Sequence, residues 1–290
     1  MATPSAEDIA IVLGLSTGES SFVNWKPGET VTRLKRYETF QDCLYYPPNR
    51  EQLVVRSEFC AKYLPATVAH LLDELAKHID SPNPISRMES DPFFDMVVIV
   101  HSNPVFIKYL NSRKEIAGPG KDLAEALALN VVVLGRKYDP ILLVQQSEED
   151  QVDQIPLYVA LKALLVAICI LSKHGRPIPP IAQKQLLPYM HRWGSQAHIE
   201  EIRDICLDIS GALTDSWVFS EGTDIHDMRK ILTGRKYCGF PECDSLSETL
   251  RTCKRCQTVS YCSVEHQRAH WTLDSKTLPA HKRVCFRTEF

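Results

Sequence analysis

Cysteine residues crowd near the end of this 290-residue chain, and no other feature constrains its fold as strongly. Six of the ten cysteines lie between Cys238 and Cys285. The stretch is poor in aliphatic residues, and so small a segment rarely folds without a metal or disulfides. The N-terminus, MATPSAEDIAIVLG, lacks the basic and apolar regions of a signal peptide, so we expect an intracellular chain with reduced thiols. The cluster therefore predicts metal binding rather than disulfides.

The cysteines and histidines of this cluster come in four short pairs, each spaced to hold one metal ion. The pairs follow C-x4-C, C-x2-C, C-x3-H and H-x3-C spacing: Cys238/Cys243, Cys253/Cys256, Cys262/His266 and His281/Cys285. Residues four positions apart share a helix face, so the last two pairs can each bind from one helical turn. Eight ligands fill two tetrahedral zinc sites, and a site with four protein ligands is structural because a catalytic zinc keeps an open position. We therefore predict two structural Zn²⁺ ions.

The order of these pairs resembles the MYND zinc-finger family. Tyr261 precedes the third pair, Gln267 follows His266, and Trp271 stands four residues further on, as in the family. His266 occupies a position where the family usually has cysteine. The resemblance implies an interleaved arrangement that spacing alone does not fix. It assigns Cys238, Cys243, Cys262 and His266 to a first zinc, and Cys253, Cys256, His281 and Cys285 to a second.

A second histidine, His270, competes with His266 for the ligand position. His266 holds the family's ligand position, whereas His270 lies two helical turns beyond Cys262. We therefore expect His266 to be a ligand and His270 not to be one. The alternative, in which His270 binds zinc and His266 does not, stays open.

The resemblance also implies a partner, since MYND modules resemble docking surfaces for short proline-rich peptides, often of a PxLxP type. Gln267 and Trp271 match the family's peptide-contacting positions, and their i, i+4 spacing places them on one helix face. The alternative is that Trp271 caps the small zinc core and Gln267 is an ordinary exposed residue.

Residues 1–230 resemble no family but show helical periodicity of apolar residues. The pattern predicts an all-α domain, either an irregular helical bundle or an armadillo/HEAT-like array. We expect an irregular segment at residues 16–49, a short helix at 228–232, a split at Pro104 and a helix end at Gly135. The expected helices span 6–15, 66–80, 91–110, 121–135, 152–174, 181–193 and 199–213.

One of these helices has an apolar run, residues 155–172, that reaches the lower limit of about 18 residues for a membrane span. Lys162 near its middle would carry a charge into the bilayer. We therefore predict a buried helix of a soluble domain and no membrane contact.

Charge is spread unevenly along the chain, whose net charge is −3. Residues 235–290 hold ten Lys or Arg and six Asp or Glu, a formal +4, which leaves −7 for residues 1–234. This asymmetry favours a helical domain of residues 1–230 and a zinc finger of residues 231–290, with its core at 238–285. Each zinc cluster of three thiolates and one histidine would subtract one charge, so nucleic acid is not expected to be the main partner.

These observations favour a protein–protein interaction adaptor that is not an enzyme. A SET methyltransferase would carry its zinc module inside a β-rich domain, whereas here the module follows helices. One alternative is an enzyme with an unrecognised catalytic site in the helical domain and the finger as a targeting appendage. Another is a transcriptional co-regulator, because the sequence leaves nucleus and cytoplasm undecided.

Overall fold

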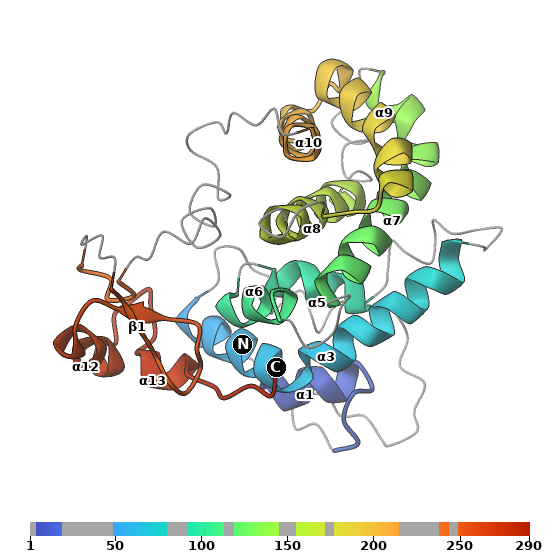
Figure 1. Cartoon of the computed structure of the whole chain (residues 1–290). Coiled ribbons are helices and arrows are strands. Elements are labelled where there is room, and N and C mark those ends of the chain that lie inside the picture. Colours follow the sequence, from blue (N-terminus) through green and yellow to red (C-terminus); the bar gives the residue numbers. More distant parts are fainter. Residues whose placement is uncertain are drawn as a thin grey trace. The chain divides into compact units, whose positions relative to one another are not determined.

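The computed structural model describes residues 4–18, 49–79, 92–101, 103–112, 119–144, 155–171, 177–214, 238–243 and 249–290. Within these segments, the regular structure before residue 215 is helical, and the C-terminal module (residues 238–290) follows it (Figure 1). The predicted fold class, an all-α region followed by a small two-zinc module, is confirmed. The predicted domain boundary, the helix at 228–232 and most of the segment at 16–49 lie outside the described residues, and the boundary stays a prediction.

The described segments fall into two compact units. The first comprises residues 1–67, 102–109 and 230–290, and the second comprises residues 68–101 and 110–229. The first unit therefore holds the C-terminal module together with three helices or parts of helices from the N-terminal region.

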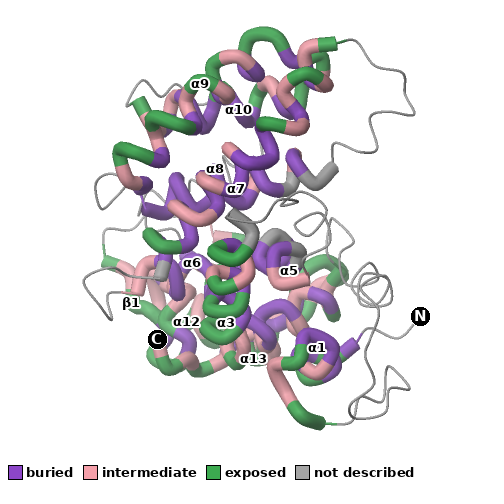
Figure 2. Tube along the Cα trace, turned by 90° about the vertical axis from the view of Figure 1, so that its right-hand side faces the viewer, coloured by how far each residue is buried: buried purple, intermediate pink, exposed green. Residues whose placement is uncertain are grey.

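The central helix of the second unit is α8 (Ile155–Leu171), which contacts α7 (Pro119–Leu142), α10 (Glu200–Leu213) and α5 (Pro92–Val100). From residue 160 to residue 171 every side chain except that of Lys162 is buried (Figure 2). A helix that is apolar on all sides belongs to a core, as predicted for this stretch. Among the described residues, no helix combines the length and apolarity needed to cross a membrane.

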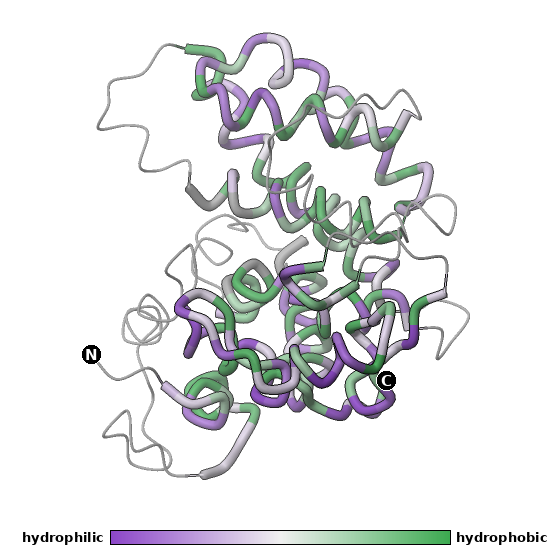
Figure 3. The backbone as a smooth tube through the Cα atoms, turned by 90° about the vertical axis from the view of Figure 1, so that its left-hand side faces the viewer, coloured by the Kyte–Doolittle hydropathy of each residue, from purple (hydrophilic) through white to green (hydrophobic). Residues whose placement is uncertain are grey.

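The helices α9 (Pro180–Gln196) and α10 form an antiparallel pair in the same unit. Near one end, the side chain of Gln183 donates to the carbonyl of Leu213 at 2.8 Å. Near the other end, Gly194 lies against Leu207. Both helices alternate between hydrophilic and hydrophobic residues, as the uppermost pair of helices in Figure 3 shows. Their apolar sides supply core residues such as Trp193 and Ile209, which are fully buried.

Gly135 does not end its helix, which corrects the predicted boundary, because α7 continues to Leu142. A Cβ atom at this position would lie 2.8 Å from the ring of Tyr189 on α9. The glycine therefore allows two helices to approach closely, and this packing role outweighs its tendency to stop a helix.

The N-terminal part of the first unit contains α1 (Ala6–Val12), the part of α3 (Arg50–Ile79) up to residue 67, and α6 (Pro104–Leu110) up to residue 109. The α3 helix begins sixteen residues before the predicted start at residue 66 and passes through Pro65. Proline lacks a backbone N–H and usually interrupts a helix. Here Phe59 and Leu64 are fully buried, so packing holds this earlier stretch in the helix. Pro104 begins α6 and separates it from α5, as predicted.

The C-terminal module contains short elements only. Two-residue strands, β1 (Arg251–Thr252) and β2 (Ser260–Tyr261), pair in antiparallel register. The α12 helix (Val264–Thr272) follows β2, and α13 (His281–Val284) comes next along the chain. The buried hydrophobic cluster of the module consists of four cysteines and Tyr261, so an ordinary aliphatic core does not hold these elements together.

Candidate metal centre

The first group of ligand atoms joins a turn to the start of α12. Cys238 and Cys243 lie in the turn, Cys262 precedes the helix and His266 lies in its first turn. The Nδ1 atom of His266 lies 3.1 Å from the Sγ of Cys262 and 3.6 Å from the Sγ of Cys238. The Sγ atoms of Cys243 and Cys262 are 3.8 Å apart. All four ligand atoms lie within 4.8 Å of one another.

Local sequence features fix this geometry. The N–H of Gly239 donates to the carbonyl of Ser260 on β2 at 2.7 Å, and a Cβ at Gly239 would overlap the side chain of Val259. Only glycine fits this close approach. The hydroxyl of Ser263 accepts a hydrogen bond from the N–H of His266 at 3.1 Å and caps α12. The cap therefore starts the helix where His266 can face Cys262.

The second group is formed by buried residues alone: Cys253, Cys256, His281 and Cys285. The Sγ atoms of Cys253 and Cys285 lie 3.7 Å apart, and the Nε2 of His281 lies 3.7 Å from the Sγ of Cys256. Gln257 follows the C-x2-C turn with a φ of 59°, a left-handed conformation that closes the turn. Its N–H donates to the carbonyl of Cys253 at 2.9 Å.

These distances match the edges of a zinc tetrahedron. Zn–S bonds of about 2.3 Å and Zn–N bonds of about 2.0–2.1 Å imply S···S edges of about 3.8 Å and S···N edges of about 3.6 Å. Four of the five separations given above, at 3.6–3.8 Å, agree with these edges. Two groups, each of three cysteines and one histidine, are therefore positioned to bind two zinc ions, and pairs one and three alternate with pairs two and four along the chain. The ligand roles of the individual residues stay predictions.

The electrostatics of the C-x2-C turn favour thiolates. Burial opposes ionisation of Cys253, but the backbone N–H of Cys256 and the side chain of His281 more than offset it and lower the pKa of this thiol. Burial also opposes ionisation of Cys256, whose Sγ accepts from the hydroxyl of Thr258 at 3.2 Å, and the pKa of Cys256 is lowered as well. This turn is thus prepared to offer the deprotonated sulfur that zinc requires.

The other thiols are hindered by their neighbours. Desolvation and the adjacent Cys238 and Cys243 raise the pKa of Cys262 to about 11. Burial and the thiolate of Cys256 raise the pKa of Cys285. Three thiols in one group cannot all ionise easily in the absence of a compensating charge, because like charges repel at these distances. A divalent cation removes this conflict, which is a further sign that the groups suit a metal.

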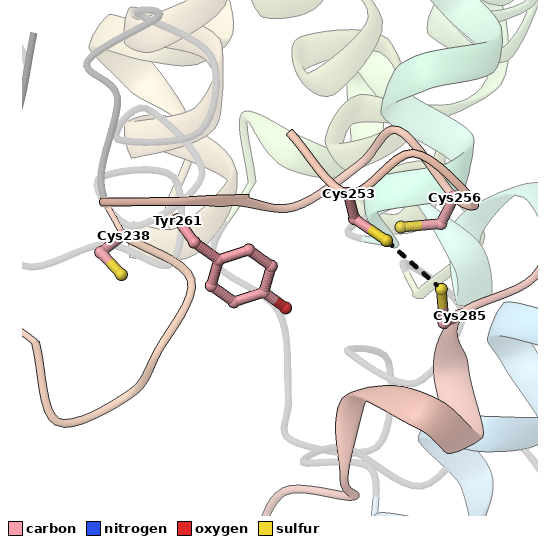
Figure 4. Packing of buried hydrophobic residues seen from close by; sticks show 5 residues of the cluster. All are labelled: Cys238, Cys253, Cys256, Tyr261 and Cys285. Atoms are coloured by element: carbon pink, nitrogen blue, oxygen red, sulfur yellow. Dashed lines mark hydrogen bonds between the residues drawn. The ribbon is translucent and has the colours of Figure 1, made fainter. Parts of the chain in front are cut away.

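Tyr261 fills the space between the two groups. Its ring lies between Cys238 of the first group and the three cysteines of the second (Figure 4). Tyr261 is 0% exposed, and its ring meets that of His281 edge to face with centroids 6.0 Å apart. Burial and the surrounding thiolates raise the pKa of the phenol. Tyr261 thus belongs to the buried cluster that joins both groups, and Phe240, Val259 and Trp271 also pack against that cluster.

Both histidines of α12 have distinct surroundings. His266 points its Nδ1 into the first group, whereas the Nδ1 of His270 lies 3.1 Å from the hydroxyl of Tyr261. The ring of His270 packs against that of His281 in a tilted arrangement, with centroids 5.3 Å apart and an angle of 30° between the planes. His270 therefore lies beside the second group without joining either set of ligand atoms.

The predicted peptide-contacting residues lie on one face of α12. Gln267 and Trp271 are both partly exposed. Trp271 also packs on the cysteine core, and its ring meets His281 at 5.8 Å and 67°. The structure thus gives Trp271 the capping contact that the sequence left as an alternative, while part of the indole still faces outward. Whether either residue binds a peptide stays a prediction.

Sequence reasoning missed the residues outside the module that hold its second group in place. Glu51 at the start of α3 accepts two hydrogen bonds from Arg283, and Lys108 of α6 donates to the carbonyl of Cys256. Glu51 and Arg283 lie 232 positions apart in the chain, and Lys108 and Cys256 lie 148 apart, so no local spacing signal could have linked them.

Residues 236–285 match the family model of the MYND finger. The match covers the C-terminal module and leaves the N-terminal helices unassigned. No curated protein and no solved structure shows significant similarity to the chain. Together with the two groups of three cysteines and one histidine, the family match identifies the C-terminal module as a zinc finger of this type.

Proposed function

Because residues 236–285 are a MYND-type zinc finger, a kind of module that commonly mediates protein–protein interaction, we propose that this chain is an adaptor that docks short proline-containing segments of partner proteins. The docking surface is the outward face of α12, with Gln267 and Trp271 at its centre. An extended proline-rich segment suits such a surface, because it loses little conformational entropy on binding and packs its rings on aromatic side chains.

The arrangement of α12 is the observation that carries the proposal. Val264, Gln267 and Trp271 recur at the three- and four-residue spacing of one helix face. Val264 is 37% exposed although it is apolar, and the indole of Trp271 is partly exposed above the zinc core. An aromatic ring held in place by a metal core is a rigid anchor of the kind that contributes most to binding energy at interfaces.

The described hydrogen bonds and ion pairs between the module and the N-terminal helices lie outside α12. They come from Arg283 on α13, from the C-x2-C turn at Cys256, from Asp274 and Ser275 after α12, and from Thr288 in the tail. As far as the described residues go, α12 can therefore meet a partner while the module stays attached to the helices.

In this proposal both zinc ions are structural and the chain is not an enzyme. Each group of three cysteines and one histidine offers four ligand atoms, which fill a tetrahedral ion and leave no position for water or substrate. The ions maintain the turn and helix that present Gln267 and Trp271.

Calorimetric titration of the zinc-loaded full chain with a synthetic peptide containing one PxLxP segment tests the proposal. We expect saturable binding that Trp271→Ala weakens at least about tenfold, as expected for an aromatic anchor. Gln267→Ala should weaken binding less.

Two controls make the result specific. Thr272→Ala changes an exposed residue on another side of α12 and should leave the affinity unchanged, and a peptide with both prolines replaced by alanine should not bind. Equal affinity of the wild type and Trp271→Ala, with both zinc ions retained, would exclude this docking surface.

A further inference from the structure

The helical half of the second zinc group is held from outside the module. Arg283 lies on α13 between the ligands His281 and Cys285. Its Nη1 donates to Oε1 of Glu51 at 3.1 Å and its Nη2 donates to Oε2 at 2.5 Å. A two-point contact between a guanidinium and a carboxylate fixes orientation as well as distance. The start of α3 therefore sets the position of the helical turn that carries two ligands.

The other half of the same group is held by α6. The ammonium of Lys108 donates to the carbonyl of Cys256 at 3.4 Å and to the hydroxyl of Thr288 at 2.6 Å. It also lies 5.8 Å from the centre of the Phe290 ring, which meets Tyr109 edge to face at 5.0 Å. Lys108 thus connects the C-x2-C turn to the tail that follows Cys285.

Among the residues that the structure describes, contacts within the module hold the first group instead. Gly239 bonds to β2, Ser263 caps the helix that carries His266, and Phe240 packs on the His266 ring at 4.9 Å. The two groups therefore differ in what orients their ligands, although each consists of three cysteines and one histidine.

We propose that Glu51 and Lys108 are positioning residues of the second zinc site, so that the N-terminal helices control how firmly this ion is held. Groups that orient metal ligands without touching the metal commonly change metal affinity by about 10–100-fold when removed. Lys108 also places a positive charge beside a cluster that carries a net charge of −1 when three thiolates bind Zn²⁺. Detachment of the module from α3 and α6 then weakens the second ion and spares the first.

The contact between Glu51 and Arg283 should affect the retention of the second zinc ion more than the stability of the helices. Glu51 and Arg283 are 50% and 30% exposed, and an ion pair that water reaches stabilises a fold only slightly. The same ion pair still affects zinc binding, because it limits the motion of the helical turn that carries His281 and Cys285. The readout must therefore follow each ion separately.

The histidines supply such a readout, because His266 faces its group with Nδ1 and His281 with Nε2. In the full zinc-loaded chain labelled with ¹⁵N-histidine, long-range ¹H–¹⁵N spectra distinguish these two coordination modes. A competing chelator is added, and the loss of each metal-bound histidine signal is timed. We expect Lys108→Met and Glu51→Gln each to accelerate loss at His281 about tenfold, the lower end of the range for such residues, and to leave His266 unchanged.

Matched variants separate positioning from general electrostatics. Lys282→Met removes an exposed positive charge on α13 itself and should change neither rate. Lys108→Arg keeps a donor at the same place and should retain most of the zinc affinity. Glu51→Arg alone should lose the second zinc ion faster than the wild type. The double variant Glu51→Arg, Arg283→Glu, which exchanges the two charges, should restore the retention of this ion.

Three outcomes would overturn the proposal: no change at His281, equal acceleration at both histidines, or an effect of Lys282→Met as large as that of Lys108→Met. Far-UV circular dichroism of each variant checks that the helices are intact. If Lys108→Met disturbs the helices, the rate of zinc loss at His281 in the Glu51→Gln variant tests the proposal, because Glu51 is exposed.

Discussion

The hydroxyl of Tyr261 and the Nδ1 of His270 lie 3.1 Å apart in a partly buried contact of the zinc finger. This contact gives His270 a partner of its own. Burial and the neighbouring His281 lower the pKa of His270 to about 4, so the ring is neutral at pH 7. A neutral, hydrogen-bonded imidazole that packs against a ligand ring is a packing residue, whereas His266 faces three thiols.

This difference predicts the zinc content of two variants. His266→Ala should bind one zinc ion per chain, because the three cysteines that remain in the first group lack a fourth ligand. His270→Ala should bind two, because it removes only a packing contact beside the second group. Elemental analysis of purified chains measures both values against the wild type, for which we expect two. Loss of an ion from His270→Ala, with two retained in His266→Ala, would reverse the assignment.

The zinc finger could be predicted from the sequence in more detail than the rest of the chain, and the reason is physical. A ligand pair such as Cys262 and His266 is separated by one helical turn, so its spacing alone encodes the geometry. The contact between Glu51 and Arg283 depends on how the chain folds back on itself over 232 positions. Pairwise spacing carries no information about such contacts.

Packing also explains the errors made with the helices. Gly135 and Pro65 are residues that usually interrupt helices, and both lie inside one here. At Gly135 the missing side chain makes room for the ring of Tyr189, and around Pro65 the burial of Phe59 and Leu64 maintains the helix. Local propensity is a weak term compared with tertiary packing.

Gly135→Ala should therefore destabilise the protein, although alanine is the better helix former by about 1 kcal/mol. The added Cβ would lie 2.8 Å from the ring of Tyr189, and overpacking of this kind costs about 1–3 kcal/mol. Urea denaturation followed by far-UV circular dichroism measures the loss. Gly194→Ala is the control, because its Cβ would meet the flexible end of Leu207 at 3.1 Å and should cost less. An increase in stability for Gly135→Ala would show that α7 and α9 are less tightly packed.

The capping contact of Trp271 predicts an effect on the zinc finger itself. Trp271→Ala removes an indole that packs on the cysteine core and on His281. A fully buried aromatic residue costs about 3–5 kcal/mol when truncated, so we expect about 1–3 kcal/mol for this partly exposed one. Hydrogen exchange of the β2 amides in the zinc-loaded chain measures the change. Gln267→Ala should stay within about 0.5 kcal/mol of the wild type, as surface substitutions usually do. A similar loss in both variants would mean that Gln267 also has a structural role.

A buried carboxylate in α10 predicts a stabilising substitution with a definite pH dependence. Burial and the nearby Asp204 raise the pKa of Asp208, so the folded state binds this proton more tightly than the unfolded state. Stability from this group is therefore greatest at low pH and is lost as the pH rises through the folded pKa. Asp208→Asn should raise the melting temperature at pH 7.5, and the gain should shrink as the pH is lowered towards 4.

Asp204→Asn, which removes only the exposed neighbouring charge, should give a smaller gain of the same sign. Thermal melts at several pH values measure both variants. A lower melting temperature for Asp208→Asn at pH 7.5 would show that the carboxylate makes a stabilising contact.

Removal of zinc should act on the first unit and spare the second. The tail that follows Cys285 places Phe290 against Tyr109 and Thr288 against Lys108, so loss of the module also removes packing from α6. The core of the second unit around α8 consists of apolar side chains and needs no metal. Hydrogen exchange with mass spectrometry, before and after a strong chelator, should show lost protection in residues 249–290 and in α6. Peptides from α8 should keep their protection. Added zinc should restore protection in residues 249–290 and in α6. Loss of protection in α8 as well would mean that the zinc ions stabilise the whole chain, while unchanged α6 would mean that the tail contacts contribute nothing.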